Sequence, residues 1–425
     1  MVGTSASHWA HAALDPATHL LPAIRSFYPA FTAYFRNTKT LTNLATYKAY
    51  YADADPFHSA MAFCAAVSFY VWIMEKITGN ASQVDGLWTF LPLIYSVHFT
   101  VHKYFTYQPA KISLFHGVQH ASIWDKLEPR LALMTALSLI WSVRLTYNAY
   151  RRGMFKLGEE DYRWPLLRKT MSRPVWEIFS IFFIAIAQNI LLAITALPNY
   201  LLLTTTSVKH VTEPVPRPVN KLILGDYVLA ALFVLNLTIQ FYADQQQWNY
   251  QNYKRGKNPQ EKPLPNAMVD PVTKLPLQRQ NVTPHSTPED AQRGFVTKGL
   301  WAWSRHPNFA CEQNTWWILY AFVPLTFLPT DLDFTKAHWS HFLNYAILSP
   351  LAMNALFLAS TRYSEQVSAE KYPEYEDYQK RVGMFLPIDT LLRSIYYKVF
   401  ASKETKHRVE ANVWGKSQIN KKKSQ

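Results

Sequence analysis

Cysteine and glycine are scarce in this sequence, and each shortage excludes a class of protein. Among 425 residues only Cys64 and Cys311 occur, and they lie in different segments without the spacing of metal ligands. Neither a disulfide framework nor a structural zinc site is therefore expected. Glycine amounts to 12 residues, and no stretch, including "GFVTKG" at 294–299, has the G-x-G-x-x-G spacing of a dinucleotide-binding loop. Any dinucleotide would have to be held by side chains and helix ends.

A cleavable signal is also missing from the start, "MVGTSASHWAHAALDPATHLL". This stretch lacks both the basic beginning and the continuous apolar run of a secretory signal peptide. We expect the first membrane span to direct the chain to its membrane instead.

Apolar segments of about 17 to 25 residues, the length needed to cross roughly 30 Å of hydrocarbon, recur along the chain. The mean hydropathy of −0.12 is lowered by Pro-rich and Lys-rich stretches, so local windows outweigh it. The sequence predicts an all-α, polytopic integral membrane helical bundle with about seven transmembrane helices. The expected spans are 57–74, 87–107, 131–150, 175–197, 222–244, 314–329 and 342–360.

Basic residues give the chain a formal net charge of +14, and they gather in two connections between the expected spans. Residues 151–173 and 254–305 are rich in lysine and arginine, whereas the neighbouring connections carry few. This alternation fits the positive-inside rule and places both basic loops and the C-terminus in the cytosol. The charge therefore indicates contact with membrane lipids, and no nucleic-acid partner is expected.

The same pattern divides the chain into a lumenal N-terminal segment, a transmembrane domain with a Pro-rich cytosolic loop, and a basic cytosolic tail. Their expected bounds are 1–56, 57–400 with the loop at 254–298, and 401–425. The tail ends in "KKKSQ", whose Lys422 and Lys423 resemble the dilysine retrieval signal of endoplasmic reticulum membrane proteins. We therefore expect a multi-pass protein of that membrane; a solvated basic tail is the alternative.

Polar side chains inside apolar spans lack water and tend to face a bundle interior or a cavity. In the fifth expected span and its extension, such residues recur at helical intervals that place them on one face. They are Asn236, Gln240, Asp244, Gln247 and Gln251. The row predicts the wall of a polar cavity that opens to the cytosol. For a lone polar residue such as Gln188, an interhelical hydrogen bond worth about 1 kcal/mol is the simpler interpretation.

The stretch "WAWSRHPNFACEQNTWW" (301–317) places basic and acidic groups at the edge of an aromatic run. Pro307 suits the first position of a helix, whose free N–H groups would lie beside Arg305 and His306 and would suit a phosphate or pyrophosphate. Asn308, Glu312 and Trp316 would share a face of that helix. The pattern indicates a nucleotide-cofactor pocket; the alternative is an interfacial anchor of basic and aromatic side chains.

Five blocks in order carry a resemblance to a known family. They are "VDGLWTFLPLIY" (84–95), "RLTYNAYRRG" with "EEDYRW" (144–164), "ADQQQWNYQNYK" (243–254), "GLWAWSRHPNFACE" (299–312) and "EYEDYQKRVGMFLP" (374–387). The chain resembles membrane-bound steroid 5-alpha-reductase-like proteins (3-oxo-5-alpha-steroid 4-dehydrogenase-like), and within them the subgroup with a conserved domain of unknown function. The blocks span about residues 84 to 390.

The resemblance implies a helical bundle whose C-terminal half closes over NADPH from the cytosolic side, with a hydrophobic small-molecule substrate entering from the bilayer. It implies no metal site. The resemblance also implies which residues contact NADPH, and Trp316 is added to them because of its position on the helix. The full set is Asn148, Arg163, Asp244, Gln247, Arg305, His306, Asn308, Glu312, Trp316, Tyr375, Tyr378 and Arg381. For the last three, a juxtamembrane amphipathic helix is the alternative.

Two positions depart from the family pattern. Family members usually have a tyrosine and a small residue before the glutamate, where this chain has Phe309, Ala310 and Cys311. A glutamate often found shortly before the Ala-Asp-Gln block is replaced here by Phe241 or Tyr242. These departures bear on turnover more than on the fold.

The function that these observations indicate is an NADPH-dependent membrane reductase of a lipid or steroid enone. Hydride from NADPH would reach the β-carbon of the enone while an acid hydrogen-bonds the carbonyl oxygen and stabilises the developing enolate. Tyr162, Asp161 and Tyr147 are the candidate catalytic donors, and the sequence does not choose among them.

The sequence is also compatible with three other functions. An S-adenosylmethionine-dependent membrane methyltransferase would share an Arg-His-Pro block, and a non-catalytic lipid- or sterol-binding protein could use the same fold. The pairs His98/His102 and His116/His120 have the spacing of iron ligands in membrane hydroxylases, although such enzymes also need adjacent histidines, which are missing. Interfacial histidines are the simpler interpretation of these pairs.

Overall fold

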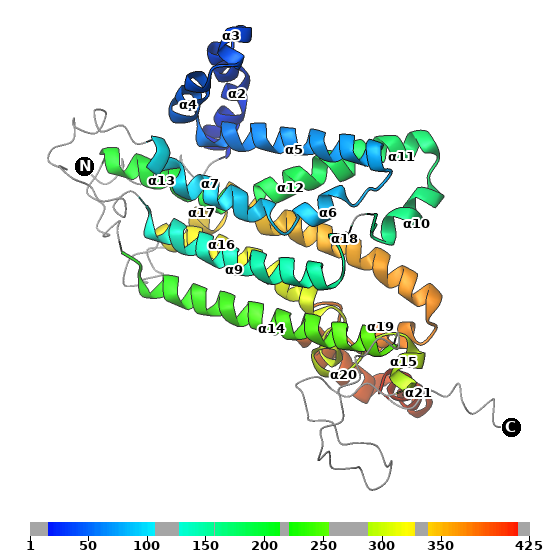
Figure 1. Cartoon of the computed structure of the whole chain (residues 1–425). Coiled ribbons are helices and arrows are strands. Elements are labelled where there is room, and N and C mark those ends of the chain that lie inside the picture. Colours follow the sequence, from blue (N-terminus) through cyan, green and yellow to red (C-terminus); the bar gives the residue numbers. More distant parts are fainter. Residues whose placement is uncertain are drawn as a thin grey trace, which may run out of the picture. The chain divides into compact units, whose positions relative to one another are not determined.

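The computed structural model describes residues 16–106, 127–156, 158–212, 221–254, 288–327 and 339–414. Every regular element within these ranges is a helix, which confirms the all-α prediction (Figure 1). The chain forms two compact units. The first unit comprises Met1–Val234 and Trp316–Met353, and the second comprises Leu235–Thr315 and Asn354–Gln425.

Three long helices begin in one unit and end in the other. They are α14 (Leu224–Lys254), α16 (Pro307–Phe327) and α18 (Leu348–Lys371). The other helices of the first unit are η1 (Pro16–Leu20), α2 (Leu21–Tyr34), α3 (Thr38–Leu41), α4 (Leu44–Asp53), α5 (Pro56–Thr78), α6 (Gln83–Leu87), α7 (Leu91–Thr106), α9 (Pro129–Arg151), α10 (Arg163–Thr170), α11 (Arg173–Phe179), η3 (Ser180–Ala187), α12 (Gln188–Ile194), α13 (Leu197–Thr212), α17 (Trp339–Phe342) and η6 (Tyr345–Ile347).

The second unit adds α15 (Pro288–Arg293), η4 (Gly299–Ala302), α19 (Tyr375–Arg381), α20 (Pro387–Phe400) and α21 (Lys403–Trp414). Most of the expected Pro-rich loop, 255–287, lies outside the described residues. Its described end is packed: Asp290 and Arg293 of α15 form a buried ion pair, and Phe295 joins a hydrophobic cluster. The end of the basic tail, 415–425, also lies outside the described residues.

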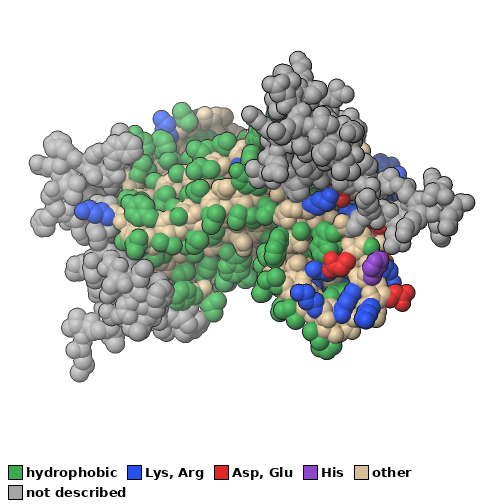
Figure 2. All heavy atoms as spheres, turned by 90° about the horizontal axis from the view of Figure 1, so that it is seen from below, with side chains coloured by type: hydrophobic (Ala, Val, Ile, Leu, Met, Phe, Trp, Pro, Cys, Tyr) green, Lys and Arg blue, Asp and Glu red, His purple; other side chains and the backbone are tan. Residues whose placement is uncertain are grey.

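Three helical stretches are long and apolar enough to cross a membrane. They are Pro56–Thr78, Arg173–Ile194 and Leu224–Lys254, and they overlap the expected spans at 57–74, 175–197 and 222–244. Figure 2 shows hydrophobic side chains over much of the visible face, with few charged side chains among them. Because a surface of this kind is stable against lipid tails rather than water, these helices make the chain a membrane protein. The other four expected spans stay a prediction.

The first of these helices shows how the sequence sets its ends. Asp55 precedes α5, and its carboxylate accepts a hydrogen bond from the backbone N–H of Phe57 at 2.8 Å, while Pro56 takes the first helical position, where no donor is needed. At the other end Gly79 has φ of +69°. Glycine adopts this left-handed conformation without steric cost, and its N–H closes the helix on the carbonyl of Glu75 at 2.7 Å.

Some polar groups buried in the apolar spans of the first unit bond to other segments of the chain. The helix α5 packs along η3 and α12 (Figure 1), where Ser180 donates a hydrogen bond to Glu75. Gln188 accepts a hydrogen bond from Trp88 Nε1 at 3.0 Å. Gln188 is therefore satisfied by a hydrogen bond within the protein, although its partner lies in the turn between α6 and α7 rather than on a helix.

A buried ion pair holds three helices of the first unit together. The guanidinium of Arg130 on α9 donates two hydrogen bonds to Asp226 on α14, at 2.6 and 3.0 Å, and a third to Thr326 Oγ1 on α16, at 2.6 Å. Asp226 is 1% exposed. A buried carboxylate without its cation would keep the full cost of its lost hydration.

We expect Arg130→Met to destabilise the folded protein by about 3–5 kcal/mol, because it leaves Asp226 buried and unpaired. The double variant Arg130→Met/Asp226→Leu should recover most of the loss, because it removes both charges. Thermal unfolding of the detergent-purified protein measures both effects, with the exposed Arg25→Met as the control. Equal stability of the two variants would contradict the role assigned to this pair.

Candidate functional site

The polar row on α14 meets the first turns of α16 within the second unit. Gln240 Nε2 donates hydrogen bonds to Glu312 Oε2 at 2.6 Å and to the carbonyl of Asn308 at 3.1 Å. Asn308 Nδ2 in turn donates to Asp244 Oδ1 at 3.0 Å. One turn along, Asn236 Nδ2 donates to the carbonyl of Cys311 at 2.7 Å. We call this set, Asn236, Gln240, Asp244, Asn308 and Glu312, the α14–α16 ladder.

The helical spacing explains why these side chains meet. Asn236, Gln240 and Asp244 lie four residues apart on α14, so they form one stripe. Asn308 and Glu312 are also four apart and form the facing stripe on α16. Four of the five side chains are buried, and Asn308 is half-buried. The expectation that the polar row shares a face is therefore confirmed for its first three members, and its partner is α16.

Two buried acceptor atoms on this stretch of α14 make no hydrogen bond among the described residues: Oε1 of Gln240 and Oε1 of Gln247. A third, the Thr361 hydroxyl, lies on α18. A buried polar atom without a partner costs on the order of 1–3 kcal/mol. An ordered water or a ligand can supply the missing partner of such an atom.

Gln246, which no sequence pattern distinguishes from the glutamines beside it, ties α14 to the segment before α16. Its Oε1 accepts a hydrogen bond from the N–H of Leu300 at 2.9 Å. Gly299, with φ of +66°, lies so close that a Cβ there would be 2.7 Å from the Gln246 amide. Trp301 Nε1 adds a hydrogen bond to the carbonyl of Ala243 at 3.1 Å. The packing of this glycine turn therefore needs a residue without a side chain.

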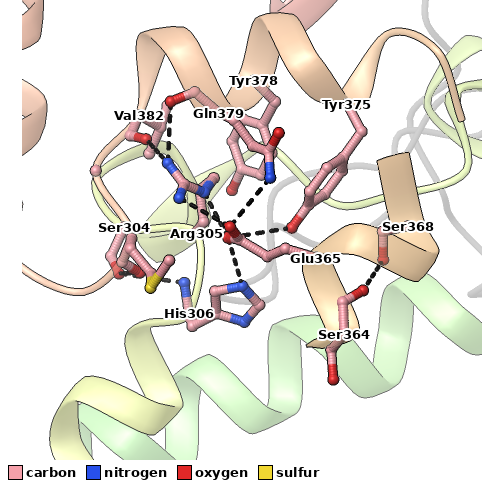
Figure 3. Close-up of polar contacts among 12 residues, drawn as sticks. Ser304, Arg305, His306, Ser364, Glu365, Ser368, Tyr375, Tyr378, Gln379 and Val382 are labelled. Atoms are coloured by element: carbon pink, nitrogen blue, oxygen red, sulfur yellow. Dashed lines mark hydrogen bonds and ion pairs between the residues drawn. The ribbon is translucent and has the colours of Figure 1, made fainter. Parts of the chain in front are cut away.

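One buried carboxylate, Glu365 on α18, collects the polar side chains around the start of α16 (Figure 3). Arg305 donates to both of its oxygens, from Nε at 2.6 Å and from Nη2 at 3.0 Å. His306 Nε2 lies 2.9 Å from Oε1, Gln379 Nε2 donates to Oε2 at 3.1 Å, and the Tyr375 hydroxyl lies at 3.5 Å. We call Glu365, Arg305, His306, Tyr375 and Gln379 the Glu365 cluster.

The charges in this cluster follow from burial and pairing. Burial alone would raise the pKa of Glu365, but hydrogen bonds from His306 and Arg305 and the guanidinium charge lower it from 4.5 to about 2. Burial lowers the pKa of His306, against the opposing effect of Glu365. At neutral pH the carboxylate is therefore ionised and the imidazole neutral, with Nε2–H donating to Glu365.

Hydrogen bonds to backbone carbonyls join the segment 305–306 to the segment 379–384, and we call this contact the junction. The N–H groups of Arg305 and His306 donate to the carbonyls of Gly383 at 2.9 Å and Met384 at 3.1 Å. Arg305 Nη1 also donates to the carbonyls of Gln379, at 3.0 Å, and of Val382. The junction fixes the residue at which α16 begins, which is Pro307 as the sequence predicts.

These contacts change the interpretation of the Arg-His-Pro block. The sequence predicts that Arg305 and His306 hold a phosphate at the start of α16, and that role stays a prediction. In the structure the anion that they hold is the Glu365 carboxylate (Figure 3). At the helix start, the N–H of Phe309 donates to Asn308 Oδ1 at 3.0 Å. The block therefore positions α16, and through α16 the ladder.

The C-terminal candidates lie in the second unit but not on the ladder. Tyr375 and Tyr378 belong to a hydrophobic cluster with Phe295, and the Tyr378 hydroxyl donates to the carbonyl of Trp301 at 2.5 Å. Arg381 donates to Glu410 at 2.8 Å and to Ser394 Oγ at 2.5 Å, and its guanidinium lies over the ring of Trp414. These partners give all three residues a role in packing.

The remaining candidates lie in the first unit. Arg163 donates to both oxygens of Asp161, at 2.8 and 3.0 Å. Burial opposes the effect, but these hydrogen bonds and the charge of Arg163 lower the pKa of Asp161. Asn148 accepts a hydrogen bond from Arg151 at 2.9 Å. Trp316 is buried edge-to-face against Trp141.

The two tyrosines proposed as donors, Tyr147 and Tyr162, are exposed in the first unit. The guanidinium of Arg151 lies 5.3 Å from the ring centre of Tyr147. Because Asp161 is paired with an arginine and its pKa is lowered, it favours the ionised form and is a poor proton donor at neutral pH. The tyrosines are the better candidates of the three.

The histidine pairs are placed only in part. His98 lies 2.9 Å from the carbonyl of Pro56 and 3.2 Å from the Tyr51 hydroxyl, and His102 lies 3.2 Å from the carbonyl of Tyr51. His116 and His120 lie outside the described residues. Within the described part of the chain, no group of three or more His, Cys, Asp or Glu side chains could hold a metal ion.

We expect acid to weaken the junction through Glu365. Its folded-state pKa is lowered, so its stabilising contribution is complete above pH 4.5 and is lost as the pH falls towards 2. The lowered pKa of His306 acts in the same direction below pH 6.5. The contribution of Glu365 is on the order of 3 kcal/mol.

The measurement compares thermal unfolding of the wild type and Glu365→Gln between about pH 7 and pH 3. The variant should be less stable at neutral pH, because it leaves Arg305 buried without its counter-charge. Its stability should also fall less steeply with acid. Parallel curves for the two proteins would show that Glu365 does not carry this pH dependence.

Comparison with known proteins assigns the chain to a family. The model of the family described as "Protein of unknown function (DUF1295)" matches residues 71–382, a range that includes the α14–α16 ladder and Glu365. An uncharacterized protein of Schizosaccharomyces pombe is 30% identical over 354 residues, which cover 83% of this chain and 86% of the relative. No solved structure matches the chain. The chain belongs to the DUF1295 family.

Proposed function

We propose that the protein is an NADPH-dependent reductase that acts on the carbon–carbon double bond of a lipid or steroid enone. The proposal rests on the resemblance of its five sequence blocks to steroid 5-alpha-reductase-like proteins. The single structural observation that supports it is the α14–α16 ladder, which brings two carboxylates and three amides together between helices of mainly apolar sequence. A plain lipid-facing helix pair has no need of such groups.

The acceptor atoms at the ladder fit part of the cofactor. NADPH carries amide, amino and hydroxyl groups, all of which donate hydrogen bonds. Oε1 of Gln240 and Oε1 of Gln247 are buried acceptors that make no hydrogen bond among the described residues, and Asp244 and Glu312 add carboxylate oxygens. These four side chains, with Asn308, are the ones we propose to hold the nicotinamide, ribose or adenine part of the cofactor.

The other residues of the proposal have either a positioning role or a catalytic role. Arg305 and His306 position α16 through Glu365 and so set the register of Asn308 and Glu312. The cofactor would supply the hydride. An acid would donate a hydrogen bond to the carbonyl oxygen of the substrate and so stabilise the enolate, the role for which the sequence puts forward Tyr162, Tyr147 and Asp161. Apolar side chains around the site would keep water from competing for the same groups.

The departure at Phe309 removes one polar contact of the family pattern. The Phe309 ring stacks on His306, with ring centres 5.6 Å apart, and meets Phe357 edge-to-face at 5.1 Å. Phenylalanine therefore serves in packing at a position where a tyrosine hydroxyl would also offer a donor. In this proposal recognition therefore depends on the acceptor atoms of the ladder, such as Oε1 of Gln240.

One observation favours a second candidate, a membrane methyltransferase that uses S-adenosylmethionine. The ladder contains Asp244 and Glu312 but no cation, and Arg305 beside it is already paired with Glu365. Carboxylates attract the positively charged sulfonium and amino groups of S-adenosylmethionine, whereas the phosphates of NADPH need cations from elsewhere in the chain. The choice between the two cofactors is therefore a question of measured affinity.

We expect NADPH to raise the thermal stability of the wild type, by an amount equivalent to about 2.7 kcal/mol at one hundred times its dissociation constant. Glu312→Gln should reduce this shift, because it removes a carboxylate from the ladder. The matched control is Asn314→Ala, which changes an exposed residue on the same helix. Consumption of NADPH with a lipid enone would then establish the reaction.

Three outcomes would count against the reductase. A shift with S-adenosylmethionine and none with NADPH would favour the methyltransferase. Binding of lipid with neither cofactor would favour a lipid-binding protein. An NADPH shift that Glu312→Gln leaves unchanged would place the cofactor away from the ladder.

The cellular location is part of the proposal. We place the protein in the endoplasmic reticulum membrane, with its C-terminus in the cytosol, on the basis of the basic connections and of Lys422 and Lys423 near the C-terminus.

A further inference from the structure

The helix α20 (Pro387–Phe400) has its polar side towards the protein and its apolar side outward. Thr390 Oγ1 accepts a hydrogen bond from the N–H of Gly383 at 2.7 Å and donates to the carbonyl of Trp303 at 2.6 Å. Ser394 Oγ accepts from Arg381 at 2.5 Å. Polar residues three or four positions apart therefore anchor the helix to the second unit.

Two further residues complete this inner side. Arg393 donates to Asp389 at 2.9 Å and to the carbonyl of Gln379 at 2.9 Å, which caps the end of α19. Tyr397 packs against the hydrophobic cluster of the second unit. The inner stripe of α20 is therefore Thr390, Arg393, Ser394 and Tyr397, at intervals of three, one and three residues.

The opposite side of α20 is apolar and exposed. It includes Ile395 at 58% and Val399 at 63% exposure, and its complete set is Ile388, Leu391, Leu392, Ile395, Tyr396, Val399 and Phe400. Scattered apolar residues on a protein surface are ordinary, but a continuous stripe along four turns of one helix is not. In water such a stripe would be an aggregation hazard.

Basic and phenolic groups border the apolar stripe. An open pocket of about 410 Å³ is lined by Lys380, Leu392, Arg393, Tyr396 and Tyr397. Arg393, Lys380 and their acidic neighbours Asp389, Glu376 and Asp377 form ion pairs with one another. Lysine and arginine beside tyrosine rings are typical of the level at which phospholipid headgroups meet acyl chains.

We propose that α20 lies in the plane of the membrane surface, with its apolar stripe inserted among the lipid acyl chains and the Lys380–Arg393 edge at the level of the phosphates. The occupant of the stripe is the lipid bilayer, because the same chain carries three helical stretches long and apolar enough to span it. The helix is too short to cross the hydrocarbon, since 14 residues extend about 21 Å. It therefore anchors the second unit beside the headgroups.

This geometry has a consequence for the site. The segment that leads into α20 is Gly383–Met384, whose carbonyls accept hydrogen bonds from Arg305 and His306. An anchored α20 therefore restrains the junction that fixes the start of α16. This inference does not rest on the proposed function, since it holds for any ligand of the ladder.

The test uses the full chain in phospholipid nanodiscs, with a nitroxide label on an introduced cysteine. The native Cys64 and Cys311 are both buried, so labelling is directed to the new site. Ile395→Cys reports the apolar stripe, and Glu404→Cys, an exposed position on the neighbouring α21, is the matched control. Collision rates of the label with oxygen, which dissolves in lipid, and with a water-soluble nickel chelate are measured by electron paramagnetic resonance.

We expect the label at 395 to collide mainly with oxygen and the label at 404 mainly with the nickel chelate. Equal access of nickel at both positions would place α20 in water and overturn the proposal. A label at 395 that neither reagent reaches would show that protein, such as a second copy of the chain, covers the stripe, and would overturn it as well. Because neither readout uses NADPH, failure here is distinguishable from failure of the proposed function.

Discussion

The buried carboxylate of Glu365 is the constraint on which the second unit depends. It lies on α18, and the residues that bind it come from two other segments, Arg305 with His306 and Tyr375 with Gln379. An ionised carboxylate that is 3% exposed is stable only with its cation and hydrogen-bond donors in place. The chain must therefore bring α18, the start of α16 and α19 together, and α16 can begin only at Pro307. The register of Asn308 and Glu312 against α14 follows from that single point.

Placing polar groups inside apolar helices has a cost that the ladder only partly removes. Each amide of Asn236, Gln240 and Asn308 donates to a neighbouring helix, which satisfies donors but leaves acceptor atoms such as Gln240 Oε1 without a partner among the described residues. Buried acceptors beside carboxylates select ligands that carry hydroxyl, amide or amino groups. The same local chemistry suits either proposed cofactor, so measured affinities must decide between the proposed reductase and the methyltransferase.

The sequence predicts the parts of this site that depend on helical period and on proline. The four-residue spacing on α14 and the helix start at Pro307 are both found in the structure. The sequence does not predict the role of Glu365, because its partner Arg305 is 60 residues away in the chain. Glu365 lies in the polar stretch "RYSEQVSAEK", which has the composition of a solvated helix face. For the same reason Arg305 and His306 suggest a phosphate when read alone. The sequence also does not predict which side of α20 faces the protein, because packing decides it.

Hydrogen exchange of the full chain in lipid tests the central claim, that Glu365 fixes the start of α16 and thereby the ladder. The account predicts slow exchange of the backbone amides at 305–312 in the wild type, since those of Arg305 and His306 donate to Gly383 and Met384. In Glu365→Gln, exchange should accelerate at 305–312 and along 236–244, while the apolar part of α5 stays unchanged. Exchange at 305–312 that is identical in the two proteins would contradict the account.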